Sequence, residues 1–170
     1  MMSTQKLSEG EPLEVLAGEL LRREGLRLAV AESCTGGLVG HRLTNVPGSS
    51  TYYMGSVTAY AYEAKVRLLG VRWGTLEKYG AVSKETVLEM ACGVRRALAA
   101  DIGVSVSGIA GPGGSTPDKP VGLVWIGLSA AGVDEAWKFI WPGDRLAVKE
   151  QSAEAALRLL VDYLSERETH

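Results

Sequence analysis

The sequence has few residues of the types that bind metal ions or form disulfides, with only two cysteines and two histidines among 170 residues. Cys34 and Cys92 stand far apart and form no CxxC pair, and one histidine is the last residue. A usual zinc site therefore lacks its ligands. We expect no metal ion and no cofactor, and a chain of this length needs neither a metal nor a disulfide to fold.

Positive charge is not in excess either, because 18 Lys and Arg residues are set against 20 Asp and Glu residues. Nucleic-acid binding usually depends on a basic surface, so we expect no nucleic-acid partner. The sequence also has no window of about 20 apolar residues, and its polar start lacks the apolar core of a secretion signal. We therefore expect no membrane partner and a cytoplasmic location.

The length corresponds to one domain, at roughly 100 to 200 residues per domain. We expect a flexible segment over residues 1–10 and one folded domain over residues 11–167. Hydrophobic periodicity and turn residues predict the elements. The expected helices cover residues 12–24, a stretch ending at 44, 63–69, 84–100 and 144–167, and the expected strands cover 26–31, 52–60, 102–106, 121–130 and 135–141. This order predicts an α/β fold with helices on both faces of a mixed sheet.

Glycine is abundant, at 21 residues, and is concentrated where the chain turns after a strand. One glycine-rich loop covers residues 33–37, and another covers 107–114 within a 14-residue connection that ends at Pro120. Connections of that length without structure of their own are often functional. Because ligands bind beyond the carboxyl ends of strands in such sheets, we expect the two loops to meet at one rim.

Ser33 is the candidate nucleophile, at the start of the helix that follows the first loop. Backbone N–H groups around Cys34, Thr35, Gly36 and Gly37, together with the helix dipole, are suited to stabilise an anion. The alternative is a helix cap, in which Ser33 or Thr35 satisfies only a backbone N–H. The segment matches neither of the common phosphate-binding patterns, GxxxxGK[ST] and GxGxxG, nor the GxSxG pattern of serine hydrolases.

Histidine is not available as a general base, because His41 falls on the following helix and His170 is the last residue. A lysine can replace it if burial keeps the amine neutral. Lys65 follows an apolar and aromatic run that begins at Tyr60, which makes it a candidate, although a lysine paired with an acid on the surface is the more common case. Tyr60 and Tyr62 are either packing residues or proton-transfer partners of such an amine.

Several short strings, in this order and spacing, resemble the C-terminal domain of competence-damage-inducible (CinA) proteins. They are Ala31 to Gly37 (AESCTGG), Pro47 to Ser50 (PGSS), Tyr60 with Glu63 to Lys65 (EAK), Gly80 to Ser83 (GAVS), Ser107 to Pro112 (SGIAGP), Lys119 to Gly122 (KPVG) and Gly143 to Arg145 (GDR). Each string is weak alone, but together they are specific and span about residues 10–165. The resemblance implies a three-layer α/β/α fold with a mixed, mostly parallel sheet.

Stand-alone domains of this family include nicotinamide mononucleotide deamidases, which release ammonia from the carboxamide of that nucleotide. The resemblance implies that Ser33 is the nucleophile, Lys65 its general base and Tyr60 an assisting group. A small-molecule nucleotide is then the expected partner, and the family suggests a homodimer. For the substrate we add Ser107, Gly108 and Gly111 of the second loop, with Arg145 as a cation. Arg145 equally fits an ion pair at a helix start.

Two departures from the family leave alternatives open. Members commonly have Tyr-Ser-Asn where this chain has Tyr60-Ala61-Tyr62, which allows a non-catalytic nucleotide-binding or regulatory module. The separate N-terminal domain of longer CinA proteins has no counterpart here, so we do not expect its activity.

A thiol mechanism through Cys34 and a DNA-associated competence role are two further alternatives. The aromatic residues Tyr52, Tyr53, Trp137 and Trp141 fit a self-association surface and a core equally well.

Overall fold

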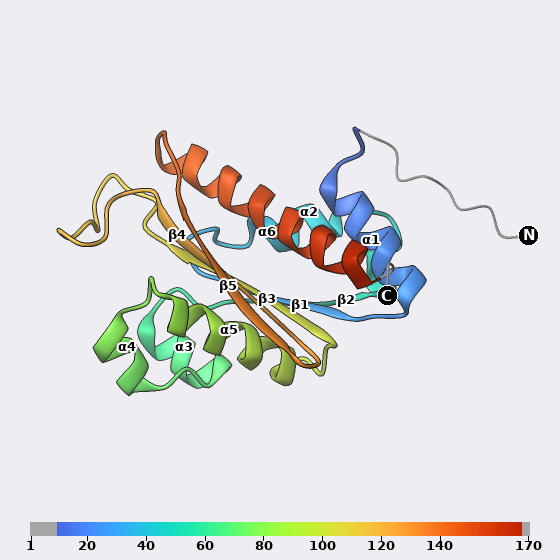
Figure 1. The fold of residues 1–170 in the computed structure, drawn as a ribbon, viewed down its shortest axis with the longest axis horizontal. Helices are drawn as coiled ribbons and strands as arrows, with labels where there is room; N and C mark the ends of the chain where they lie inside the picture. The colour runs from blue at the N-terminus through green and yellow to red at the C-terminus, as the bar shows by residue number, and fades with distance from the viewer. Residues whose placement is uncertain (1–9, 168–170) are drawn as a thin grey trace, which may run out of the picture.

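The computed structural model describes residues 10–167, which form one α/β domain built in three layers (Figure 1). The expected flexible segment, residues 1–10, lies outside this range except for Gly10. A five-stranded sheet forms the middle layer, with strand order β2-β1-β3-β4-β5. None of the described helices is long and apolar enough to cross a membrane.

The sheet is mixed, as the sequence predicted. Its strands are β1 (Leu28–Glu32), β2 (Tyr53–Thr58), β3 (Ile102–Gly108), β4 (Leu123–Ala130) and β5 (Val133–Ile140). The strand β1 pairs in parallel with β2 and with β3, whereas β3, β4 and β5 pair antiparallel. The parallel strands β1 and β3 therefore end at the same rim, with Glu32 opposite Val106, and the two glycine-rich loops start side by side.

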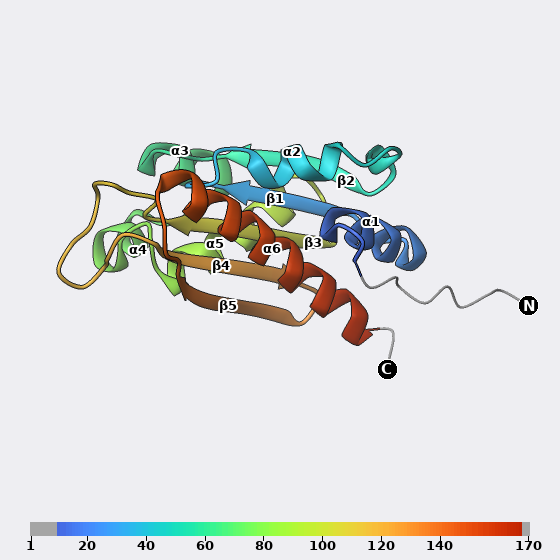
Figure 2. The same cartoon turned by 90° about the horizontal axis from the view of Figure 1, so that it is seen from above.

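Helices cover both faces of the sheet, which confirms the three-layer arrangement (Figures 1 and 2). One layer contains α1 (Leu13–Glu24), α2 (Leu38–Thr44) and α6 (Arg145–Arg167), and the other contains α3 (Tyr62–Leu69), α4 (Trp73–Tyr79) and α5 (Lys84–Ala97). A short 3-10 helix, η1 (Ser49–Thr51), precedes β2. Most bounds fall within a few residues of the expected ones.

The strand β1, between β2 and β3, is buried along its whole length. Leu28 and Val30 belong to the hydrophobic cluster under α1, α2 and α6, whereas Ala29 and Ala31 belong to the cluster under α3, α4 and α5. This alternation follows from the pleat of a strand, which sends successive side chains to opposite faces. The small alanines allow the second layer of helices to lie close to the sheet.

Of the aromatic residues that fitted either a surface or a core, Tyr52 belongs to the core. Tyr52 is buried, and Tyr53, Trp137 and Trp141 are partly buried and pack against the same cluster. The rings of Phe139 and Trp141 stack with centroids 4.7 Å apart. The homodimer expected from the resemblance stays a prediction.

The helix α4 was not expected from the sequence. Its stretch has a glycine inside and only Thr75 and Leu76 are buried, so the periodic signal is weak. The helix is instead fixed by Glu89 of α5, whose carboxylate accepts hydrogen bonds from the Arg72 guanidinium (2.6 Å) and the Thr75 hydroxyl (2.7 Å). A tertiary contact therefore determines this element, which local patterns cannot reveal.

We predict that Gly93→Ala destabilises the domain, because α5 touches α3 at this glycine. A Cβ atom at position 93 would lie 1.8 Å from the carbonyl oxygen of Leu69, the last residue of α3. We expect the free energy of unfolding to fall by about 1–3 kcal/mol in urea denaturation. The matched control is Gly74→Ala in α4, where nothing lies within 4 Å. It should raise stability by about 0.5–1 kcal/mol. Equal effects of the two changes would contradict the close α3–α5 contact.

Candidate active site

Ser33 begins the turn that leaves β1 at the rim of the sheet. Its backbone amide donates to Val106 O of β3 at 3.0 Å, which anchors the turn between the two parallel strands. Gly36 and Gly37 follow with φ values of 61° and 103°, which only glycine adopts readily. The turn therefore needs both glycines in order to lead from β1 into α2.

Ser33 and Lys65, which are 32 residues apart in the sequence, are brought into contact. Lys65 Nζ lies 3.0 Å from Ser33 Oγ. The lysine reaches the serine from α3, on the face of the sheet toward which Ala29 and Ala31 point. Its side chain is only 1% exposed, although it carries a titratable amine. The expected nucleophile and base thus form a buried pair.

Burial, rather than the hydrogen-bond partners of Lys65, favours the neutral amine. Nζ also lies 2.8 Å from Ala59 O and 3.1 Å from Tyr60 O, so two main-chain carbonyls accept from it. Ser33 Oγ is its third acceptor, so Nζ lies among three oxygen atoms. Burial lowers the pKa of Lys65 to about 8, from an ordinary value above 10, because the charged form loses its hydration. Among the described residues, no carboxylate contacts this amine and stabilises its charged form.

Glu32 is an unexpected part of the site. It is fully buried beside Ser33. Its carboxylate accepts hydrogen bonds from the Thr35 hydroxyl (2.8 Å) and the amides of Val39 (2.8 Å) and Gly40 (3.2 Å). It therefore holds the turn and caps the first turn of α2. The sequence did contain a signal for this role, because alternation along β1 places Glu32 on the face that α2 covers.

This arrangement corrects the expectation that α2 offers its positive end to a substrate. The helix starts only at Leu38, and Glu32 already occupies its first amides. The alternative role of Ser33 or Thr35 as a helix cap is not observed either, because Glu32 caps the helix. Within residues 10–167, no acceptor is found for the backbone amides of Thr35 and Gly37. These two amides of the turn that carries Ser33 are donors without a partner among the described residues.

Tyr60 contributes its backbone and its hydroxyl to different contacts. Its carbonyl holds Lys65, whereas its side chain is 61% exposed and its hydroxyl accepts a hydrogen bond from Arg145 at 3.0 Å. Arg145 also donates to Gly111 O at 2.8 Å. Arg145 therefore ties the second glycine-rich loop to the segment that carries Lys65. The expected ion pair of Arg145 is not observed within the described range.

The other two loop residues expected to bind substrate have structural contacts. Ser107 is buried, and its hydroxyl donates to Ala81 O at 2.8 Å. Gly108 ends β3 against Val124 of β4, and a Cβ there would lie 2.5 Å from Val124 Cγ2. Their assignment to substrate binding remains a prediction. A pocket of about 510 Å³ lies further along the loop and is lined by Gly111, Pro112 and Arg145 among others.

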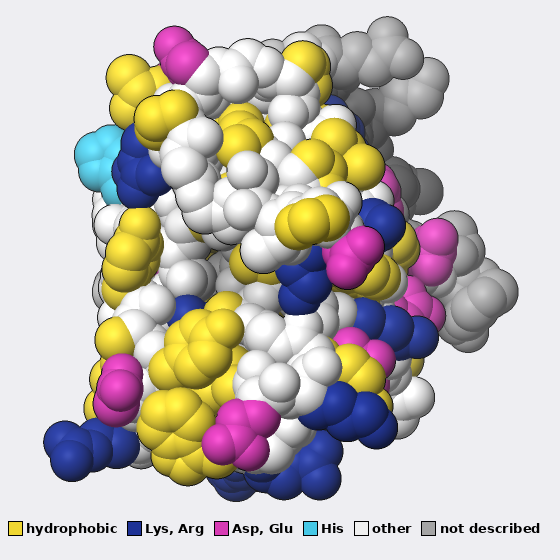
Figure 3. Space-filling view, turned by 90° about the vertical axis from the view of Figure 1, so that its left-hand side faces the viewer, with side chains coloured by type: hydrophobic (Ala, Val, Ile, Leu, Met, Phe, Trp, Pro, Cys, Tyr) yellow, Lys and Arg dark blue, Asp and Glu magenta, His cyan; other side chains and the backbone are white. Residues whose placement is uncertain are grey.

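A second pocket, of about 470 Å³, lies on the other side of the loop. Its lining residues include Tyr62, Ile109 and Lys119. Figure 3 views this end of the molecule, where basic, acidic and hydrophobic side chains are mixed rather than sorted into one charged surface. The altered residue Tyr62 thus lines a pocket at the rim, while Lys65 lies beneath the surface.

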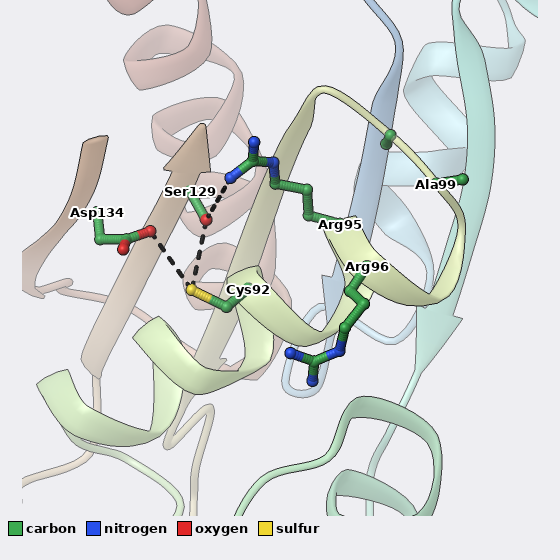
Figure 4. Close-up of a pocket in the computed structure, with 7 residues that line it drawn as sticks. Cys92, Arg95, Arg96, Ala99, Ser129 and Asp134 are labelled. Carbon is green, nitrogen blue, oxygen red and sulfur yellow. Dashed lines mark hydrogen bonds between the residues drawn. The ribbon is translucent and has the colours of Figure 1, made fainter. Parts of the chain in front are cut away.

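Neither cysteine is suited to be the nucleophile. Burial raises the pKa of the Cys34 thiol to about 12, so the thiolate is not formed at neutral pH. Cys92 lies at the other end of the sheet in a pocket of about 420 Å³, where its thiol contacts Ser129 and Asp134 at 3.3 Å each (Figure 4). Burial also raises the pKa of Cys92, with a further rise from Asp134.

Comparison with known proteins places the chain in a family. The family model for the CinA C-terminal domain matches residues 10–164. The chain belongs to the CinA C-terminal domain family. A CinA-like protein of Salinibacter ruber is 52% identical over 145 residues, which are 85% of this chain and 35% of that protein. A CinA-like protein of Chloroherpeton thalassium is 49% identical over 158 residues, or 91% of this chain and 38% of that protein.

Solved CinA structures share the fold. The competence damage-inducible protein A of Klebsiella pneumoniae has a TM-score of 0.87 and 35% identity, over 90% of this chain and 95% of that one. The competence/damage inducible protein CihA of Agrobacterium tumefaciens has a TM-score of 0.85 and 35% identity, over 94% of this chain and 99% of that one. The chain spans little more than a third of the length of the curated CinA relatives.

We predict that Glu32→Gln destabilises the CinA fold of this chain. The carboxylate accepts three hydrogen bonds, and an amide NH2 in place of one oxygen would face an N–H donor. An unsatisfied buried pair of this kind costs about 1–3 kcal/mol, which urea denaturation measures. The exposed Glu63→Gln in α3 serves as the control and should leave stability nearly unchanged. A Glu32→Gln protein as stable as the unmodified one would contradict the capping role.

Proposed function

We propose that the domain hydrolyses the carboxamide of nicotinamide mononucleotide to give nicotinate mononucleotide and ammonia. The observation that carries the proposal is the 3.0 Å contact of Ser33 Oγ with Lys65 Nζ, whose other two partners are carbonyl oxygens. Burial lowers the pKa of Lys65 to about 8, so a neutral amine forms beside a hydroxyl, which is the requirement for serine activation without histidine. The choice of substrate rests on the family resemblance.

The reaction proceeds through an acyl-enzyme. Lys65 takes the hydroxyl proton while Ser33 Oγ attacks the carboxamide carbon, and the amides of Thr35 and Gly37 stabilise the oxyanion. The proton then passes from Lys65 to the departing nitrogen, which leaves as ammonia. Lys65 next takes a proton from water, the hydroxide attacks the ester, and the proton returns to Ser33 Oγ as the carboxylate product leaves.

Substrate binding is assigned to the rim around this pair. We assign the phosphate and ribose to Arg145 and Gly111 and to the pocket beside them. Tyr60 assists through its carbonyl, which holds Lys65, and through its hydroxyl, which binds Arg145. A homodimer in the cytoplasm is proposed with this function, on the resemblance and the sequence alone. The non-catalytic alternative is supported by Ala61 and Tyr62, and would appear as nucleotide binding without product.

We predict that Ser33→Ala abolishes ammonia release from nicotinamide mononucleotide, because among residues 10–167 no other hydroxyl is bonded to Lys65. The expected loss in kcat is at least about 1,000-fold, measured by an ammonia-coupled assay with and without a chelator. Cys34→Ala is the matched control and should retain most activity, since its thiol is protonated at neutral pH. Normal turnover by Ser33→Ala, or inactivity of Cys34→Ala alone, would refute the serine mechanism. Tight binding with no product from the unmodified protein would favour the non-catalytic alternative.

We predict that kcat/KM rises with pH and levels off above an apparent pKa near 8. The base acts only after it has lost its proton, and burial sets the pKa of Lys65 at about 8, so the active fraction grows as the pH rises through that value. Lys65→Met should lower kcat by about 100-fold to 10,000-fold and remove this rise. Lys78→Met, on the exposed side of α4, should leave the profile unchanged. A profile that stays flat between pH 6 and about 9 would exclude Lys65 as the base.

A further inference from the structure

Lys149 of α6 lies against the turn that carries Ser33, and nothing so far assigns it a role. Its Nζ is 3.6 Å from the position that a Cβ atom on Gly36 would take. Its charge also reaches the Cys34 thiol, where it opposes the rise in pKa that burial causes. The side chain is half-buried, so this ammonium is fixed near the nucleophile turn rather than extended into solvent.

The Lys149 ammonium lacks an anionic partner within residues 10–167. No hydrogen bond or ion pair joins it to another described residue, whereas Arg42 in the same helical layer bonds to both Glu14 and Glu154. A half-buried ammonium loses part of its hydration, and an anion bound beside it would offset that loss. This ammonium is therefore available to an anion that binds next to the turn of Ser33.

Arg145 and Lys149 are four residues apart on α6 and share one face of the helix. Arg145 points to Tyr60 and Gly111, and Lys149 to Gly36. The two cations thus lie one turn apart along the rim, next to the loops on both sides of Ser33. Two adjacent cations suit a dianion better than the single charge of an oxyanion, for which the amides of Thr35 and Gly37 remain.

We propose that Lys149 binds the phosphomonoester group of the substrate, together with Arg145. The inference rests on the proposed function and extends it by naming the group that selects a nucleotide over its nucleoside. Lys149 belongs to α6 rather than to either glycine-rich loop, which is why loop motifs do not indicate it. Its spacing of four residues from Arg145 is the signal that the sequence offers.

The test compares nicotinamide mononucleotide with nicotinamide riboside, which lacks the phosphate. Lys149→Met should raise KM for the mononucleotide by about 10-fold to 100-fold, the size of one lost charge-assisted hydrogen bond, with little change in kcat. Kinetic constants for the riboside should stay unchanged, and Lys149→Arg should restore most of the affinity. Lys138→Met, on the exposed side of β5, is the matched control and should alter neither substrate. Thermal unfolding checks that each variant is folded.

An unchanged KM for the mononucleotide, or equal losses with both substrates, would overturn the assignment while leaving the amidohydrolase proposal in place. A protein that releases no ammonia would refute the proposed function instead. In that case calorimetric titration with nicotinamide mononucleotide decides the role of Lys149. Binding that is about 10-fold to 100-fold weaker in Lys149→Met supports the phosphate site, and equal binding or no binding to the unmodified protein rejects it.

Discussion

The pleat of β1, a strand buried on both faces, determines how the candidate site is built. Two polar residues follow each other where this strand ends, and the alternation of side chains sends them to opposite layers of helices. Glu32 therefore meets the start of α2, and Ser33 meets Lys65 of α3. The directions of the Glu32 and Ser33 side chains are fixed by the strand. A shift of β1 by one residue would exchange its two faces and bury the wrong side chains in both hydrophobic clusters.

Burial of Lys65 links the chemistry to the stability of the fold. The folded protein holds the pKa of Lys65 near 8, whereas the unfolded chain returns it to an ordinary value above 10. Between these values the unfolded state binds more protons, so this group makes the fold more stable as the pH rises through that window and less stable as it falls. The same desolvation that makes the amine a base thus opposes folding at neutral pH, and packing of α3 against α5 must compensate.

The sequence predicts the parts of the structure that local patterns encode. The buried runs of β1 and β3 and the periodic α1 and α5 follow from hydrophobic spacing, and the element order predicts that the two glycine-rich loops meet at one rim. Helix α4 does not, because Glu89 fixes it from another helix. Ser33 and Lys65 are candidates from their local sequence and from the family resemblance, but their contact depends on the register of β1 with β2 and on the position of α3. Alternation along β1 could place Glu32 opposite α2, whereas the position of Lys149 against the turn of Ser33 required the three-dimensional arrangement.

The departure at Ala61 and Tyr62 affects the surroundings of the base less than its sequence position implies. Lys65 is held by the carbonyls of Ala59 and Tyr60, and carbonyls are present whatever side chains those positions carry. Ala61 only precedes α3, while the Tyr62 hydroxyl accepts from the Ala81 amide at 3.3 Å and its ring lies 6.4 Å from that of Trp73. Tyr62 thus connects the helices of one layer and lines a pocket beside the loop. Changes at these two positions are therefore expected to alter which substrates the rim accepts, while the buried amine and hydroxyl stay in contact.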